Sequence, residues 1–163
     1  MAMLQPLVPG ASSKPLIDTK APIRIYNAEF SHDGRWIAYQ SDESGRFEIY
    51  VHPFPAVQTG RWQITTNGGA HPLWSRDGRE LFFIDGKGTL ISLAVRAGGT
   101  FNHAPGTPLF EAGQYFVETA RDYDVTKDGA RFLFVKNVTT VPRPAVVVVA
   151  NWFDEVRAKM GTR

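Results

Sequence analysis

The sequence predicts an all-β fold, namely a β-propeller with three four-stranded antiparallel blades and a short C-terminal helix. One observation is a gapless repeat: a bulky apolar residue, Ser or Thr, any residue, Asp-Gly, and then an apolar strand. A second is its spacing, because the repeated Asp33, Asp77 and Asp128 are 44 and 51 residues apart. A blade takes about 40–50 residues, so each copy of the repeat marks one blade.

Each Asp-Gly pair predicts a tight hairpin between the first two strands of its blade. Such a turn needs a positive φ, which Gly34, Gly78 and Gly129 adopt without steric cost. The preceding Asp accepts hydrogen bonds from turn amides, and the Ser or Thr hydroxyl assists it.

Alternating apolar residues and β-branched or aromatic enrichment predict the remaining strands within one domain that spans residues 1–163. The first unit covers about residues 20–65, with strands at 25–30, 35–40, 47–52 and 62–65. The second covers about 66–110, with strands at 70–74, 80–84, 90–95 and 107–110. The third covers about 111–151, with strands at 122–125, 131–136 and 145–151, and it lacks an outer strand.

Residues 15–18 are the predicted substitute for that outer strand, which makes three blades in all. Propellers typically have four to eight blades, so three blades form half of a six-bladed ring. We expect a homodimer in which one chain completes the other's blade by strand addition. The residues expected to pair between chains are Leu16 and Ile17 with Val146, Val147, Val148 and Val149. The alternative is that the chain belongs to a longer propeller.

At residues 152–160 the hydrophobic period changes from two to about 3.6, which predicts a short helix. This helix either covers the edge of the last blade or docks on a partner.

Residues 31–51, SHDGRWIAYQSDESGRFEIYV, resemble the WD40-like PD40 repeat of TolB-like bacterial β-propellers. The second unit keeps the Ser-x-Asp-Gly-Arg pattern, and the third is weaker, with Thr126 for Ser and Ala130 before the basic residue. The resemblance covers about residues 14–156, and the tail resembles the end of propellers that follow some bacterial Ser/Thr kinase domains. It implies a propeller used for binding, as a scaffold or sensor. Similar repeats also gate prolyl-oligopeptidase-like enzymes.

Sequence motifs for catalysis are missing. The chain has no Gly-x-Ser-x-Gly elbow, no Walker A motif and no Gly-x-Gly-x-x-Gly fingerprint. It has no cysteine, and its four histidines are scattered singly, so neither a metal nor another cofactor is expected.

Charge and hydropathy restrict the classes of partner that the sequence predicts. The net charge of +2, with acidic and basic residues intermixed, argues against nucleic acid. No apolar run approaches the roughly 20 residues of a membrane helix. A cytoplasmic location is the default, and a periplasmic one requires that an export signal was removed. A protein or peptide partner is compatible with the composition.

The first strand of each blade lines the channel of a propeller, so ligand contacts are expected there. Aligning the units on Ser or Thr places Tyr26, Ala70 and Arg121 at one level, and Asn27, His71 and Asp122 at the next. We predict Tyr26, Asn27, His71, Arg121 and Asp122 as ligand contacts at the channel mouth. The expected function is a non-enzymatic interaction module. The alternatives are a propeller that binds a small ligand or carbohydrate and, more weakly, a hydrolase or lyase.

Overall fold

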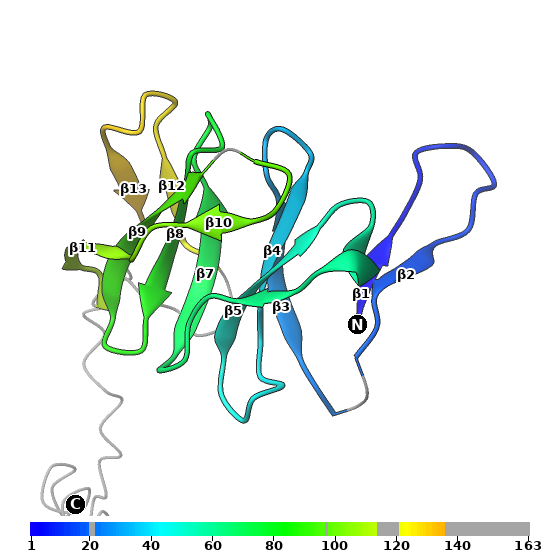
Figure 1. Cartoon of the computed structure of the whole chain (residues 1–163), viewed down its shortest axis with the longest axis horizontal. Helices are drawn as coiled ribbons and strands as arrows, with labels where there is room; N and C mark the ends of the chain where they lie inside the picture. Colours follow the sequence, from blue (N-terminus) through cyan, green and yellow to red (C-terminus); the bar gives the residue numbers. More distant parts are fainter. Residues whose placement is uncertain (20–21, 97, 114–120, 136–163) are drawn as a thin grey trace, which may run out of the picture.

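The computed structural model describes residues 1–19, 22–96, 98–113 and 121–135. In this part of the chain the elements are β-strands, apart from one short 3-10 helix, η1 (Val57–Thr59). The strands form separate antiparallel sheets that stand side by side in a row, with no closed barrel (Figure 1). The predicted all-β, propeller-like fold is confirmed.

Two sheets are complete four-stranded blades, and the second of them has one additional short strand. Blade 1 has the order β3 (Ile25–Phe30), β4 (Trp36–Ser41), β5 (Glu48–Pro53) and β6 (Trp62–Gln63). Blade 2 has β7 (Gly69–Trp74), β8 (Glu80–Asp85), β9 (Thr89–Arg96) and β11 (Thr107–Glu111), and β10 (Asn102–His103) also pairs with β9. The bounds match the predicted strands to within two residues, and β10 was not predicted.

The repeated Ser/Thr-x-Asp-Gly turn has the same geometry three times. Gly34, Gly78 and Gly129 each have φ of 70°. In the second copy the Ser75 hydroxyl donates to Asp77 Oδ1 at 2.7 Å, and the Arg79 amide donates to the same oxygen at 3.0 Å. The first and third copies make the equivalent bonds. One local hydrogen-bonding pattern therefore produces the first hairpin of every unit.

The two blades are held together by alternate residues of their central strands. Ala38 and Val51 of blade 1 belong to one buried cluster with Leu81 and Phe83 of blade 2. Trp36, Trp62 and Phe101 fill the outer part with edge-on and tilted ring contacts, such as 5.2 Å between the Trp36 and Phe101 centroids. Burial of these rings provides most of the attraction between the blades.

A two-stranded sheet flanks the blades at each end of the row (Figure 1). β12 (Tyr123–Val125) and β13 (Phe132–Phe134) pack on the outer face of blade 2. β1 (Ala2–Leu4) and β2 (Lys14–Ile17) pack on the opposite face of blade 1, where Ile17 joins a buried cluster with Tyr39 and Tyr50. The described residues thus form half a blade, two blades and half a blade.

This arrangement changes one detail of the predicted third blade and leaves the others untested. Residues 15–18 were expected to be a lone outer strand, whereas β2 is the second strand of a hairpin and pairs with β1. The third unit has two described strands. Its expected strand at 145–151, with Val146–Val149, and the helix at 152–160 lie outside the described residues, so the pairing of Leu16 and Ile17 with those valines stays a prediction.

Among the described residues, no helix has the length and apolar character that crossing a bilayer requires.

Candidate functional site at the channel mouth

The innermost strands of both blades carry a bulge at the same place. The β3–β4 register shifts between Tyr26 and Glu29, and the β7–β8 register shifts between Ala70 and Leu73. Within these bulges Asn27 has φ of 51° and His71 has φ of 57°, values that non-glycine residues adopt infrequently. Such strained, bulged positions re-aim side chains and are enriched at functional sites.

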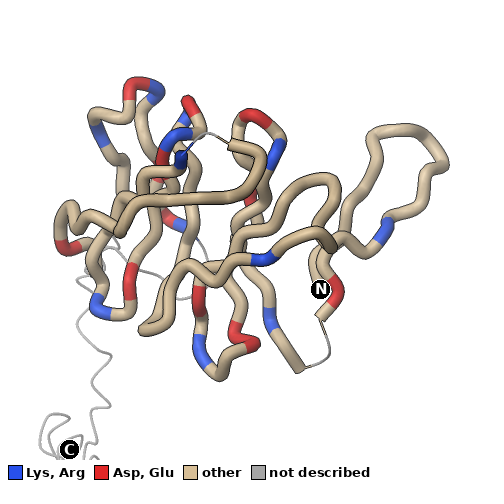
Figure 2. Tube along the Cα trace, in the orientation of Figure 1, with Lys and Arg blue, Asp and Glu red and all other residues tan. Residues whose placement is uncertain are grey.

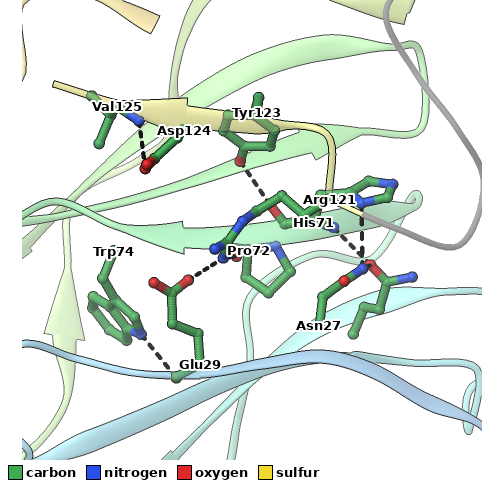
Figure 3. A network of polar contacts seen from close by, with 10 residues as sticks. Asn27, Glu29, His71, Pro72, Trp74, Arg121, Tyr123, Asp124 and Val125 are labelled. Atoms are coloured by element: carbon green, nitrogen blue, oxygen red, sulfur yellow. Dashed lines mark hydrogen bonds and ion pairs between the residues drawn. The ribbon is translucent and has the colours of Figure 1, made fainter. Parts of the chain in front are cut away.

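A buried amide joins the two bulges. Gln40, on β4, is fully buried, and its Oε1 accepts from Asn27 Nδ2 at 3.0 Å and from the His71 backbone amide at 2.7 Å. Asn27 Nδ2 also lies 3.3 Å from His71 Nδ1 (Figure 3). An amide NH₂ only donates, so this contact makes Nδ1 the acceptor and places the imidazole proton on Nε2.

The surroundings of His71 keep its imidazole neutral. Burial lowers its pKa from 6.5 to about 4; the Asp122 carboxylate opposes this shift, and the Arg121 guanidinium adds to it. At neutral pH this buried side chain is therefore a neutral imidazole.

An ion pair connects the third unit to the first across the second (Figure 3). Arg121 Nη1 contacts the Glu29 carboxylate and donates to the Pro72 carbonyl at 3.0 Å. Burial raises the pKa of Glu29 despite the opposing effect of Arg121. Tyr123 Oη donates to the His71 carbonyl at 2.6 Å, so side chains from three units meet around β7.

A cavity of about 750 Å³ opens beside these inner strands, next to the β4–β5 turn of blade 1 and the β8–β9 turn of blade 2. Tyr26 and Ala70 line it from the inner strands, and the Tyr26 and Phe47 ring centroids are 5.6 Å apart. The other lining residues come from the ends of β7 and β8 and from the adjoining turns and linkers: Arg24, Arg46, Asn67, Gly68, Gly69, Ile84, Asp85, Gly86, Lys87, Gly88 and Gly113.

The structure brings most of the predicted contacts together, in two groups. Tyr26 lines the cavity, whereas Asn27 and His71 form the cluster around Gln40, with Asp122 close enough to act on the pKa of His71. Arg121 was expected beside Tyr26 but is engaged by Glu29 and Pro72. The ligand role of all five residues remains a prediction.

Sequence reasoning missed Gln40 and Glu29. Gln40 had a detectable signal, because it is a polar residue at the end of the apolar run WIAY in a central strand. Glu29 had none, because its partner Arg121 lies 92 residues away.

No cluster of three or more His, Asp or Glu side chains able to hold a metal ion occurs among the described residues.

Fold and site together define a class: an all-β, propeller-like protein whose inner strands present a polar cluster beside a cavity. No family model matches the chain. A 93-residue stretch, 55% of the chain, is 40% identical to dipeptidyl aminopeptidase BI of Pseudoxanthomonas mexicana. That match spans 12% of the relative's length, so the chain resembles a small part of a much longer protein.

Proposed function

We propose that this chain is a non-enzymatic β-propeller interaction module, acting as a scaffold or sensor, whose ring is completed by a second copy. The observation that carries the proposal is the pair of half-blades at opposite ends of the row. Among the residues that the structure describes, each is a two-stranded sheet, and a two-stranded sheet alone is marginally stable in water.

Exposed apolar side chains support a partner at both ends. Among the described residues, six of the nine exposed large hydrophobic residues belong to the terminal hairpins or follow them directly: Met1, Met3, Leu7, Val8, Leu133 and Val135. The central strands of blades 1 and 2 are almost completely buried by comparison. Apolar surface concentrated in this way is typical of an interaction site.

Each half-blade contains the strands that the other half-blade lacks. β12 and β13 are joined by the third Asp-Gly turn, so they correspond to the first and second strands of a blade. β1 and β2 precede β3, where the third and fourth strands of the previous blade belong. Pairing β13 of one copy with β1 of the other gives the order β12–β13–β1–β2, in which β1 takes the place first predicted for residues 145–151, and two copies then make six blades.

The chief alternative is that a longer propeller supplies the missing strands. The match to a short part of a much longer relative supports this alternative. In that case the module would form part of an aminopeptidase, the activity that the name of the relative gives. Binding of a small ligand or carbohydrate at the channel mouth fits either assembly.

The solution mass of the purified chain tests the proposal. We expect sedimentation equilibrium to give twice the 18.1 kDa chain mass. Leu133 on β13 is 69% exposed and would face blade 1 of the second copy, so Leu133→Asp should give a folded monomer. Leu109→Asp on the outer strand β11 is the matched control and should remain a dimer.

Two results would contradict this assembly. A compact, monodisperse wild-type species of 18.1 kDa would exclude the second copy and favour a longer propeller. A Leu133→Asp variant that stays as dimeric as Leu109→Asp would exclude the β13–β1 pairing.

A further inference from the structure

Two basic residues occupy equivalent positions in blades 1 and 2. Arg46 lies in the β4–β5 turn, two residues before β5, and Lys87 lies in the β8–β9 turn, two residues before β9. Both line the 750 Å³ cavity, together with Arg24. Each complete blade therefore contributes one cation to the mouth of this cavity, from the turn before its third strand.

The carboxylates around this cavity are already engaged by local donors. Asp42 accepts from the backbone amide and the Nε of Arg24, both at 2.7 Å. Asp85 Oδ1 accepts from the amides of Lys87 and Thr89, both at 2.9 Å. Glu48 is buried and accepts from the Gly68 amide at 2.9 Å and from the Thr65 hydroxyl.

The cations, by contrast, keep free donors. Arg46 is 63% exposed, and its Nε is 3.8 Å from Glu48, too far for a hydrogen bond. Lys87 forms no ion pair with any residue that the structure describes. Positive charge around a concave site attracts anions, although the acidic turns nearby reduce the field (Figure 2).

The same cavity has an aromatic wall and a floor of backbone. Tyr26 and Phe47 form the wall, and the Arg24 guanidinium lies 5.0 Å above the Phe47 ring. Gly68 and Gly86 form the floor where two segments of backbone meet, because a Cβ on Gly86 would lie 2.2 Å from the Asn67 carbonyl oxygen.

We propose that this cavity binds a small anionic ligand in which a carboxylate or phosphate group is attached to a planar, apolar group. Lys87 and Arg46 contact the anion, and Tyr26 and Phe47 contact the planar group. The proposal rests on the proposed role as a binding module and adds the ligand class, which the net charge of +2 did not indicate.

Isothermal titration calorimetry with three probes tests the ligand class: N-acetylphenylalanine, phenyl phosphate and the neutral N-acetylphenylalaninamide. We expect saturable binding of at least one acid and about tenfold weaker binding of the amide. Binding of only one acid would identify the anion as carboxylate or phosphate. Failure of both acids to bind, or equal binding of the amide, overturns the proposal.

Variants then locate the site. The double variant Arg46→Gln with Lys87→Gln should weaken binding of the acid about tenfold and reduce its dependence on salt. Arg79→Gln, at an exposed position in an Asp-Gly turn outside the cavity, is the control and should bind normally. A double variant that is folded by circular dichroism and binds like Arg79→Gln overturns the assignment. Measuring the solution mass of the same samples separates failure of this site from failure of the dimer.

Discussion

At the residue scale, the fold depends on glycine at the tip of each repeated hairpin. Gly78 has φ of 70°, and the space where a Cβ would stand contains no atom within 4 Å. A substitution there is consequently opposed by backbone strain alone, with no contribution from a clash. A substitution at Gly78 therefore tests whether the Asp-Gly turn needs glycine for its positive φ.

We predict that Gly78→Ala lowers the free energy of unfolding by about 1 kcal/mol, because an L-residue is strained in the left-handed region. Urea denaturation measures the change. Gly99→Ala is the control, since Gly99 also has no atom within 4 Å of a Cβ and no positive φ, and its effect should stay within about 0.5 kcal/mol. Equal effects for the two variants would show that the turn does not require a positive φ.

His71 gives the site a predictable pH dependence. Its pKa is about 4 in the folded chain against 6.5 unfolded, so the unfolded state binds more protons between these values. Above pH 6.5 the imidazole is neutral in both the folded and the unfolded state, so the titration of His71 costs no stability. The free energy of unfolding decreases as the pH falls from 6.5 toward 4. The loss attributable to His71 is about 3 kcal/mol.

The variant His71→Asn isolates this contribution, because Asn tolerates a positive φ, as Asn27 does at the equivalent bulge. Chemical denaturation between pH 7 and 4 should show a shallower decline for the variant than for the wild type. Parallel curves would mean that His71 is not buried in the neutral form.

At the scale of elements, the strands within each repeat were predictable and the pairing of the two N-terminal strands was not. Blade 1 and blade 2 follow from local patterns, because alternation and the Asp-Gly turn act between neighbours in sequence. β1 had no such pattern, since Ala2–Leu4 becomes a strand only by pairing with β2 ten or more residues later. Its recognition needs tertiary information.

The same distinction applies to the site. The alignment of repeats correctly brought Asn27 beside His71, because equivalent strands of adjacent blades face the same channel. It did not predict the partners of Arg121, whose guanidinium is held by Glu29 and by the Pro72 carbonyl. It also could not identify the cavity cations, since Arg46 and Lys87 lie in turns of different length and sequence.

At the scale of the whole molecule, the N-terminal hairpin has two roles in the proposed ring. It covers the outer face of blade 1, where Ile17 is buried with Tyr39 and Tyr50, and it offers β1 to a second copy. Removing it therefore exposes an apolar face and also deletes half of each shared blade. Both effects are expected to weaken the dimer.

Deletion of residues 1–18 should convert the dimer into an open monomer or aggregates and lower the melting temperature. Size-exclusion chromatography with light scattering and thermal denaturation measure the two effects. Ser12→Ala, at an exposed polar position in the loop of the same hairpin, is the control and should behave like the wild type. If the truncated chain elutes as a dimer of unchanged melting temperature, residues 1–18 do not contribute to the ring. Closure would then have to involve the other end of the chain alone.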